Sequence, residues 1–412
     1  MRVLHLTPHL PYAPGGHGGA TRQFHLLRRL VERGHEVTVV APVTVDQREH
    51  VALPRAAGIA VAAVERPASR VAETLALLAR APSLVPRAAA WPLHAWQLAV
   101  LWQELRPSVR RLLAEAPPDL VSAEHDVAAN WAADLPPQLP RLLMLENVTR
   151  DYYAARAAAA SGAAARWFAL ETRRAERHAR TWLPRWSGLV CVSDEDGASV
   201  RRGYGLAART IANGVDLDAF PPVTTEPAGP PMLLFTGSMN YPPNVEGICW
   251  FVAEVWPAIR AQRSDARLRI VGREPTEAVR RLADVPGVEV TGAVPDVAPH
   301  FRDAHVVVVP LRSGGGTRLK ILEAASAGRA IVSTRRGAEG LAVTDDRELV
   351  LVDQAAPFAA RVLELLDDPA RRARLGAGAR TLAERHDWRA LGDELEAIVR
   401  ETIAAQPRTS SA

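Results

Sequence analysis

The sequence predicts an α/β protein made of two doubly wound parallel-sheet domains in series. Three observations lead to this fold class. The chain opens with an apolar run, a glycine-rich loop, a helical pattern and a second apolar run. The same alternation returns after residue 230, and a proline-rich segment separates the two series. Chain length also favours two domains, because 412 residues exceed one ordinary hydrophobic core.

The first domain is expected to begin with a buried strand at residues 2–7. Apolar residues then recur at helical spacing over 24–31, and Gly34 ends that helix before a second strand at 36–41. Strand, glycine loop, helix and strand form the opening of a doubly wound sheet. Further along, residues 119–130 predict a strand that runs into a loop.

Two stretches of the first domain have an amphipathic pattern. Residues 71–116 carry Trp91, Trp96 and Trp102 among leucine, alanine and arginine, and residues 156–185 predict one long arginine-rich helix. Helices of this kind either pack on their own sheet or lie on a membrane surface. The sequence leaves both interpretations open.

The second domain repeats the pattern of short apolar strands separated by helices. Asn244 is expected to be the N-cap of a helix over 244–263. The segment PPVTTEPAGPP at 221–231 cannot form the interior of a helix or sheet, so it is expected to be the linker between the domains. The predicted strands lie at 232–236, 268–271, 288–290, 305–310, 331–334 and 349–352.

Composition and charge narrow the class of protein. No run of about 18 uncharged apolar residues occurs, so no membrane span is expected. The N-terminus lacks a signal-peptide pattern, and Cys191 and Cys249 are too isolated for a disulfide framework or a metal site. The expected location is the cytoplasm, with the inner face of a membrane as an alternative.

The N-terminal half is basic. Residues 1–215 hold 26 arginines and 19 acidic residues. Such an excess suits an anionic partner, which could be a membrane surface, a lipid phosphate or an acidic glycan. It is equally typical of an arginine- and alanine-rich composition that has no functional meaning.

The segment PLRSGGGTRLKILEAASAGRAIVST at 310–334 predicts an anion site. A strand end leads through three glycines to a helix expected to start near Thr317. The glycines allow close approach of the backbone to a ligand, and the unpaired N–H groups of the helix attract negative charge. Arg318 and Lys320, the only lysine of the chain, add cations there. A diphosphate would suit this site, although a solvent-facing glycine turn could have the same pattern.

This segment resembles the donor-site signature of retaining GT-B glycosyltransferases of family 4, in which a strand ending in proline leads through glycines to a helix bearing Glu-Ala. Other stretches agree with it: PYAPGGHGGATRQ at 11–23, IANGVDLDAF at 211–220, LLFTGSMNYPPN at 233–244, RIVGREP, and VEVTGAVPDV at 288–297. Together they cover most of the chain.

The resemblance implies the GT-B fold, in which two Rossmann-like domains face each other across a cleft. The N-terminal domain at 1–210 would bind the acceptor, and the C-terminal domain at 231–385 would bind the nucleotide-sugar donor. A linker at 211–230 would join them. At 386–412, a last helix would return to the N-terminal domain and a disordered tail would follow.

The resemblance also implies a donor site. Glu323 would bind the ribose, Arg318 and Lys320 would bind the phosphates, and Val294 would contact the base through its backbone, with Arg273 at the border. The donor-binding set is Gly237, Ser238, Arg273, Val294, Gly314, Gly315, Gly316, Thr317, Arg318, Lys320 and Glu323.

On the N-terminal side, the resemblance implies that Gly18 and Gly19 lie against the donor phosphates or the acceptor. His125 lies about where the family places a histidine near the reactive carbon of the sugar, with Glu124 as a competitor for that position. A histidine there can bind a sugar hydroxyl and orient the acceptor. Glu146, at the end of another apolar strand, is expected in the same site. The predicted catalytic set is therefore His125, Arg318 and Lys320.

Two departures from the family pattern keep a catalytically silent protein in consideration. The family spaces two glutamates eight residues apart, but the partner position of Glu323 is Gly315. The loop after the first C-terminal strand, where the family often has an arginine and a lysine, reads Ser238, Met239 and Asn240.

No metal site and no cofactor are expected. The acidic pair of Asp216 and Asp218 and the run from Asp194 to Asp196 lack the additional ligands that a metal site needs. The expected function is metal-independent, retaining transfer of a sugar from a UDP- or GDP-linked donor to a glycan, lipid-linked or small-molecule acceptor. The alternatives are a nucleotide-sugar epimerase, a silent GT-B partner protein and, least favoured, a lectin-like glycan binder. No nucleic-acid partner is expected.

Overall fold

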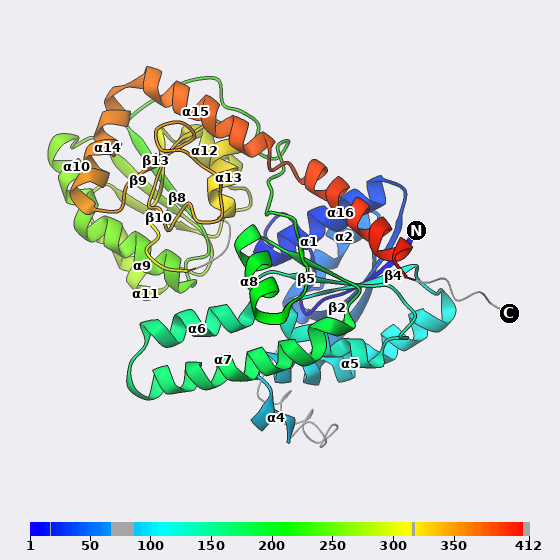
Figure 1. Ribbon diagram of the computed structural model, residues 1–412. Coiled ribbons are helices and arrows are strands. Elements are labelled where there is room, and N and C mark those ends of the chain that lie inside the picture. The colour runs from blue at the N-terminus through cyan, green and yellow to red at the C-terminus, as the bar shows by residue number, and fades with distance from the viewer. Residues whose placement is uncertain (17, 67–85, 315–317, 407–412) are drawn as a thin grey trace. The chain divides into compact units, whose positions relative to one another are not determined.

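The computed structural model describes residues 1–16, 18–66, 86–314 and 318–406. The chain divides into two compact units. Unit 1 comprises Met1–Ala212 together with the chain from Leu391 onward, and unit 2 comprises Asn213–Ala390. Each unit is a parallel sheet covered by helices (Figure 1). The predicted fold class of two parallel-sheet α/β domains is therefore confirmed.

Unit 1 contains a sheet in which seven described strands have the order β3-β2-β1-β4-β5-β6-β7. All of its strand pairs are parallel, and Leu4 of β1 lies opposite Thr38 of β2 and Val121 of β4. The order reverses between β1 and β4, which is where ligands bind in sheets of this type. The strands are β1 (Arg2–Leu6), β2 (Glu36–Thr44), β3 (Ala60–Arg66), β4 (Leu120–Glu124), β5 (Arg141–Leu145), β6 (Gly188–Cys191) and β7 (Arg209–Thr210).

Helices cover this sheet on both faces. The α-helices are α1 (Gly18–Glu32), α2 (Ala52–Ala56), α4 (Arg87–Ala90), α5 (Leu93–Glu115), α6 (Thr149–Ala159), α7 (Gly162–Trp182), α8 (Asp194–Tyr204) and α16 (Trp388–Ala404). Short 3-10 helices are η1 (Val45–Gln47), η2 (Glu49–Val51), η4 (Asp126–Asp134) and η5 (Leu183–Arg185). Among the described residues, no helix is long and apolar enough to cross a bilayer.

The prediction of one long helix over 156–185 is wrong. Ala160 and Ser161 have extended backbone angles, so the chain forms the separate helices α6 and α7. Gly162 starts α7 with a positive φ of 59°, a conformation that glycine adopts without steric cost. The two helices pack against each other as a hairpin (Figure 1).

The core of unit 1 includes the tryptophans that the sequence left ambiguous. Trp102 and Trp131 are buried and stacked, with ring centroids 5.0 Å apart and planes 16° apart. Trp91 and Trp96 pack against the buried residues Ala99 and Val100. These four side chains therefore contribute packing within unit 1.

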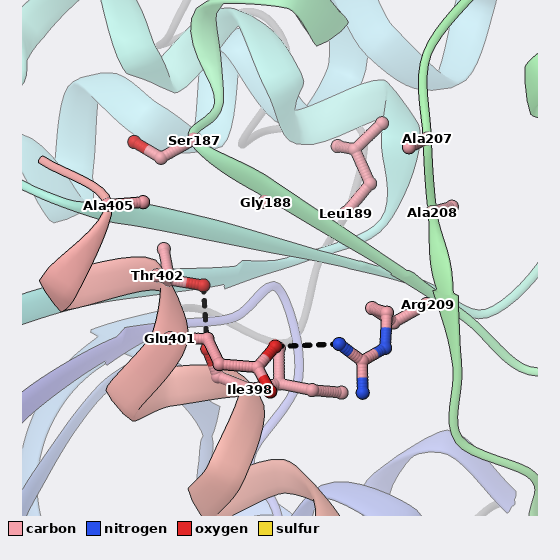
Figure 2. Close-up of a pocket in the computed structure, with 10 residues that line it drawn as sticks. All are labelled: Ser187, Gly188, Leu189, Ala207, Ala208, Arg209, Ile398, Glu401, Thr402 and Ala405. Atoms are coloured by element: carbon pink, nitrogen blue, oxygen red, sulfur yellow. Dashed lines mark hydrogen bonds and ion pairs between the residues drawn. The ribbon is translucent and has the colours of Figure 1, made fainter.

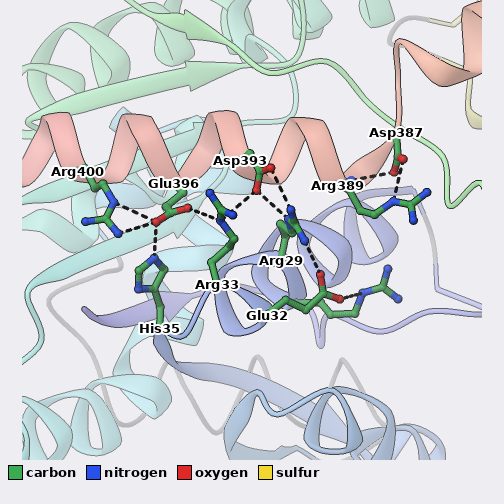
Figure 3. A network of polar contacts seen from close by, with 10 residues as sticks. Arg29, Glu32, Arg33, His35, Asp387, Arg389, Asp393, Glu396 and Arg400 are labelled. Carbon is green, nitrogen blue, oxygen red and sulfur yellow. Dashed lines mark hydrogen bonds and ion pairs between the residues drawn. The ribbon is translucent and has the colours of Figure 1, made fainter.

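Charged side chains hold α16 against α1 within unit 1 (Figure 3). Asp393 accepts hydrogen bonds from Nε and Nη2 of Arg29 at 2.8 and 3.0 Å. Glu396 accepts hydrogen bonds from Arg33 at 3.0 Å, His35 at 2.9 Å and Arg400 at 2.7 Å. Hydrogen bonds from Arg33, Arg400 and His35 lower the pKa of Glu396 to about 2.

Unit 2 contains a sheet of six described strands in the order β10-β9-β8-β11-β12-β13, again with parallel pairs. Phe235, Trp256, Phe301 and Phe358 are fully buried in its core. The strands are β8 (Met232–Thr236), β9 (Arg267–Val271), β10 (Val288–Gly292), β11 (Val306–Val309), β12 (Ala330–Ser333) and β13 (Val350–Leu351).

The helices of unit 2 correct another prediction. Asn244 is not an N-cap, because Pro242 and Pro243 start helix α9 earlier, with Tyr241 at the cap position. The expected helix over 244–263 is three segments: α9 (Pro242–Trp250), a π-helical turn η6 (Phe251–Val255) and α10 (Trp256–Gln262). The remaining helices are α11 (Glu277–Arg280), η7 (Arg281–Asp284), α12 (Ala298–Asp303), α13 (Leu319–Ser326), α14 (Ala355–Asp367) and α15 (Pro369–Glu384).

Most of the segment expected to be a linker, 211–230, lies in unit 2 and is bonded to it. The Val223 amide donates to the Ala327 carbonyl at 3.1 Å, and Arg372 donates to Glu226 at 2.9 Å. Proline prevents regular structure here, but these hydrogen bonds fix the path of the segment.

Candidate functional site

The predicted residues of unit 1 gather at the carboxyl ends of β4 and β5 and at the start of α1. Glu124 is the last residue of β4, His125 follows it, and Glu146 follows the last residue of β5. Gly18 and Gly19 form the first turn of α1. Parallel neighbouring strands end at the same edge of a sheet, so these groups form one polar cluster.

Glu124 has the most strongly perturbed environment of this cluster. Its side chain is fully buried, and neither carboxylate oxygen has a hydrogen-bond partner within the described part of the chain. Burial raises the pKa of Glu124 well above its ordinary value, and Glu146 raises it further, whereas Arg22 opposes the shift. The raised pKa favours the protonated form of the Glu124 carboxyl group, and a protonated carboxyl group can donate a hydrogen bond.

His125 has an unusual backbone conformation. Its φ of 73° and ψ of 136° are rarely adopted by residues other than glycine, and such strain costs on the order of 1–3 kcal/mol. Its Nε2 lies 3.8 Å from an Oε2 of Glu146 and makes no hydrogen bond to any described residue. The conformation places an imidazole with an available nitrogen beside a carboxylate.

Residues that the sequence did not single out support this cluster. Gln23 donates to Glu146 at 3.3 Å, and its Oε1 lies 3.4 Å from Nε2 of His5. The other ring nitrogen of His5 lies 2.8 Å from the Ser122 hydroxyl, and burial lowers the pKa of His5 to about 4. A neutral His5 thus donates to Gln23 and accepts from Ser122. A histidine in an otherwise apolar strand was the signal in the sequence.

Two further residues define the surroundings of the carboxyl groups in this cluster. Arg22 is buried and donates to the carbonyls of Ile211 and Ala212, both at 2.7 Å, while its charge interacts with Glu124 and Glu146. A Cβ atom on Gly19 would lie 2.0 Å from Oε1 of Glu146. Glycine at this position is therefore what lets Glu146 approach the first turn of α1.

In unit 2, Lys320 of α13 lies at the carboxyl end of β8. Its Nζ donates to Oδ1 of Asn244 at 2.9 Å and lies 4.1 Å from the centroid of the Phe235 ring. Burial lowers the pKa of Lys320 to about 7, with a further contribution from Arg318 and an opposing one from Glu323. A lysine in this environment gains stability when an anion binds beside it.

Glu323 and Arg318 flank Lys320 on the same segment. Burial raises the pKa of Glu323 to about 7, and Lys320 opposes this shift. Arg318 occupies the N-cap position of α13, so the helix starts at Leu319 and not near Thr317 as expected. The Arg318 side chain is 8% exposed, and burial lowers its pKa.

Two glycines, Gly237 and Gly272, allow the backbone to pack closely around Lys320. A Cβ atom on Gly237 would lie 2.8 Å from Nζ of Lys320 and 2.7 Å from Nδ2 of Asn244, and one on Gly272 would lie 1.6 Å from the Gly237 carbonyl. The loops after β8 and β9 are therefore in direct backbone contact. Nε of Arg273 lies 3.4 Å from the Ser238 hydroxyl. Arg273 therefore brings a positive charge to the loop after β8, in which residues 238–240 include no cation.

The other predicted donor residues are only partly placed. Val294 follows β10 and is half-buried against the core of unit 2. Gly314 has a φ of 91°, and a Cβ atom there would lie 2.9 Å from Pro243. Three predicted residues lie outside the described part of the chain: Gly315, Gly316 and Thr317.

Asn244 belongs to this cluster of unit 2, although the sequence pointed only to a helix cap at that position. Its Nδ2 donates to the Ser238 carbonyl at 2.8 Å while its Oδ1 accepts from Lys320. It thus connects the loop after β8 to α13. The sequence did contain a signal for this role. Pro242 and Pro243 start α9, so Asn244 lies in the first turn of that helix, near the loop that follows β8.

Two of the acidic residues considered as metal ligands, Asp196 and Asp216, have structural partners. Asp196 lies in the first turn of α8, where its carboxylate accepts from the Ser193 hydroxyl at 2.6 Å. Asp216 accepts from the amides of Asp218 and Ala219 at 3.1 and 3.3 Å. Over residues 1–16, 18–66, 86–314 and 318–406, no group of three histidine, cysteine or acidic side chains is arranged to hold a metal ion.

A cavity of about 250 Å³ lies between β6, β7 and α16 (Figure 2). Arg209 and Glu401 line it and pair with each other at 2.6 Å, and Thr402 donates to the Ile398 carbonyl at 2.7 Å. None of the described residues predicted for the functional site lines this cavity.

Both halves of the chain match known protein families. Residues 16–219 match the family described as Glycosyltransferase Family 4, and residues 230–368 match the family described as Glycosyl transferases group 1. The chain belongs to glycosyltransferase family 4. The glycine turn of α1, the Glu124 cluster and the Lys320 region all lie within the residues that match these families.

Relatives and solved structures agree with this assignment. The chain is 30% identical over 226 residues to the phosphatidyl-myo-inositol mannosyltransferase of Mycolicibacterium smegmatis, covering 53% of this chain and 58% of that protein. The chain thus matches little more than half the length of that curated relative.

The solved structures match the chain over nearly its whole length. Sucrose-phosphate synthase of Thermosynechococcus elongatus has a TM-score of 0.69 at 18% identity, covering 98% of this chain and all of that one. HepE of Anabaena in complex with UDP-glucose has a TM-score of 0.67 at 14% identity, covering 97% and 100%. At these identities the likeness shows the fold, which is GT-B.

Proposed function

We propose that this glycosyltransferase moves a sugar, with retention at the anomeric carbon, from a nucleoside-diphosphate sugar bound by unit 2 to an acceptor hydroxyl bound by unit 1. The observation that carries the proposal is Lys320. The only lysine of the chain lies at the carboxyl end of a parallel sheet, in direct contact with Asn244 and beside Glu323. Nucleotides bind at this end of such sheets.

The chemistry proposed for unit 2 is stabilisation of the leaving diphosphate by protein cations. Lys320 and Arg318 would interact with the phosphate oxygens, and the negative charge that develops as the glycosidic bond breaks would strengthen these interactions. Glu323 would accept hydrogen bonds from the ribose hydroxyls. Arg273, which lies beside Ser238, compensates for the missing cations of that loop. No metal ion is required in this scheme.

The chemistry proposed for unit 1 is orientation of the acceptor. His125 would accept from or donate to a sugar hydroxyl through its available ring nitrogen. Glu124, whose pKa is raised by burial, would donate a hydrogen bond within the same cluster when it is protonated. Glu146 would position His125 and contact the first turn of α1.

The nature of the donor and acceptor is inferred from chemistry and from the relatives. A UDP- or GDP-linked sugar is proposed as donor, which the UDP-glucose complex of HepE supports for uridine. The acceptor would be a glycan, a lipid-linked saccharide or a small natural product, and the name of the mannosyltransferase relative favours a lipid.

Peripheral membrane contact is proposed through the hairpin of α6 and α7. Tyr152, Trp167 and Leu170 are 43%, 44% and 38% exposed there. Arg156 lies over the Tyr152 and Phe168 rings at 5.7 and 4.6 Å. Exposed aromatic groups next to arginines suit an anionic lipid surface.

The proposal is tested by calorimetric binding of UDP- and GDP-sugars, with a chelator present, to the wild type and to Lys320→Ala and Glu323→Ala. We expect selective binding of one donor that both variants lose. The exposed Arg335→Ala variant is the control and should bind as the wild type does. If no nucleotide sugar binds, or if both site variants bind normally, the donor site is wrong.

A silent partner protein is the second candidate, and the sequence of the loop after β8 favours it. Ser238, Met239 and Asn240 replace the cations that the family often has there, and Gly315 replaces a glutamate. Donor binding without turnover against any acceptor would support this candidate. Conversion of the donor in the absence of acceptor would instead identify an epimerase.

A further inference from the structure

A second cavity, of about 230 Å³, lies in unit 1 and is lined by residues of α4, the first half of α5, η4 and the end of α7. Trp91, Trp102 and Trp182 line it. The Trp91 and Trp182 rings meet edge to face, with centroids 6.3 Å apart. At roughly 30 Å³ for each water of bulk liquid, the space corresponds to about seven or eight water molecules. The cavity therefore offers aromatic walls around a volume suited to one small ring.

Polar side chains line the same cavity. Asn130 is 7% exposed, and its Oδ1 has no hydrogen-bond partner in the described chain. Buried amide oxygens are almost always hydrogen-bonded, so this one needs an explanation. The terminal amide turns easily about χ2, which would bring Oδ1 within reach of a donor in the cavity.

Two more polar groups complete the lining. Gln103 projects from α5, where its Nε2 donates at 3.4 Å to the Ala99 carbonyl of its own helix. Asp134 accepts from Nε1 of Trp102 at 2.7 Å and has a second oxygen facing Arg110. Amide and carboxylate groups therefore surround the aromatic walls, and they can both accept and donate hydrogen bonds.

The cavity is separate from the cluster at the carboxyl ends of β4 and β5. Helix η4 leaves that edge directly after His125 and runs along the sheet. Near its end, the carbonyls of Ala132 and Leu135 accept from Arg141, which is the first residue of β5. Asp134 thus lies toward the amino edge of the sheet, away from Glu124 and His125.

We propose that this cavity binds one pyranose ring of a glycan, at a site distinct from the site of sugar transfer. A pyranose has an apolar face of C–H groups, which packs on indole rings, and hydroxyls at its rim, which bond to amides and carboxylates. The ring hydroxyls would supply the donor that Oδ1 of Asn130 lacks. The proposal goes beyond the transfer reaction and does not depend on it.

Other ligands fit the lining less well. A diphosphate needs cations, but Arg87 is the only cation among the described lining residues, and its guanidinium lies over the Trp91 ring at 5.3 Å. An alkyl chain would exclude water from the polar lining and would leave Oδ1 of Asn130 without a hydrogen-bond partner, which is unfavourable. A neutral sugar satisfies both the rings and the polar groups.

The test is calorimetry of the full chain with methyl glycosides of common hexoses and N-acetylhexosamines, and with their short oligosaccharides, in the absence of any nucleotide. We expect at least one of these to bind and to change tryptophan fluorescence. Trp91→Ala and Asn130→Ala should weaken that binding at least tenfold. Gln103→Ala should weaken it about three- to tenfold, the effect of one hydrogen bond.

Two control variants distinguish this site from others. Trp167→Ala removes a tryptophan that is 44% exposed elsewhere on α7 and should not change binding. Lys320→Ala removes the proposed donor site and should not change it either, so failure of the donor proposal would leave this result intact. Binding that is lost in Lys320→Ala, or unchanged in Trp91→Ala and Gln103→Ala, would overturn the inference, as would binding of no glycoside.

Thermal unfolding gives an independent measurement on Asn130. Because its Oδ1 has no partner in the free protein, Asn130→Ala should unfold at the same temperature as the wild type or higher, while glycan binding falls. A lower unfolding temperature together with unchanged binding would make Asn130 a structural residue and would contradict the proposal.

Discussion

Lys320→Met should weaken the binding of nucleoside diphosphates by about 10- to 150-fold. In the free protein, the Lys320 ammonium is bonded to Asn244 and lies over the Phe235 ring. A hydrogen bond to a charged group contributes about 1.5–3 kcal/mol, and each 1.4 kcal/mol changes affinity about tenfold. Methionine keeps an unbranched side chain of nearly the same length, so the change mainly removes the charged group.

The pKa values of this region also predict the pH dependence of binding. Lys320 has a pKa of about 7, so above that pH the diphosphate must bind a neutral amine or take up a proton. Glu323 also has a pKa of about 7, so below that pH the ribose hydroxyls meet a protonated carboxyl group. We therefore expect UDP affinity to be highest near pH 7 and to fall by up to about tenfold per pH unit on either side.

Calorimetry in Tris and in PIPES, whose ionisation enthalpies differ, would measure the proton uptake at alkaline pH directly. Lys320→Arg is the matched control, because it keeps the positive charge but does not titrate in this range. It should bind UDP and lose the decrease above pH 7. Normal UDP affinity in Lys320→Met, or an alkaline decrease that persists in Lys320→Arg, would refute the reasoning.

Three further predictions concern other parts of the chain. His125→Gly should raise the free energy of unfolding by about 1 kcal/mol, because it relieves backbone strain, and should abolish sugar transfer. His125→Ala should lose transfer without gaining stability. A glycine variant less stable than the wild type would contradict the assignment of backbone strain to His125. Glu396→Gln should lower the free energy of unfolding at pH 7 by about 1–2 kcal/mol, a value reduced because two of the arginine partners are half-exposed. Because the pKa of Glu396 is lowered, this stabilisation is complete above about pH 4.5 and is lost as the pH falls toward 2; a deficit that persists at pH 2 in chemical denaturation would argue against it. Gly237→Ala should lower UDP affinity at least tenfold in calorimetry, because the new Cβ atom would lie 2.7 Å from the Asn244 amide, whereas Gly229→Ala has nothing within 4 Å and should bind UDP normally.

Much of the fold could be predicted because hydrophobic periodicity and amino-acid composition are local properties of the sequence. The glycine loop after the first strand, the run of valines at 306–309 and the proline-rich segment each predict one conformation. The errors also have local causes. The helix over 156–185 is interrupted at Ala160 and Ser161, and the Ser161-Gly162 pair, a dipeptide that favours turns, was the local signal that the prediction overlooked. Asn244 was assigned to a cap because the two prolines before it were not read as the first helical residues.

The candidate site was less predictable, because it depends on which way side chains point and on what surrounds them. Glu124 and His125 could not be ranked from the sequence. Their difference comes from burial of the carboxyl group on one side and backbone strain on the other. The lowered pKa of Lys320 likewise arises mainly from burial, and two groups that surround its Nζ, Phe235 and Asn244, are distant in sequence. Because Lys320 is the only lysine, the sequence could single it out, but the sequence could not predict its burial.

That environment has a practical consequence for chemical labelling. Apart from the amino terminus, Lys320 is the only primary amine of the chain. With a pKa near 7, about half of the Lys320 side chains are unprotonated at neutral pH and are therefore nucleophilic. An ordinary lysine is almost entirely protonated at this pH and reacts slowly. An amine-directed acylating reagent should thus modify the protein at one internal position, and the rate of that modification would report whether the position is occupied.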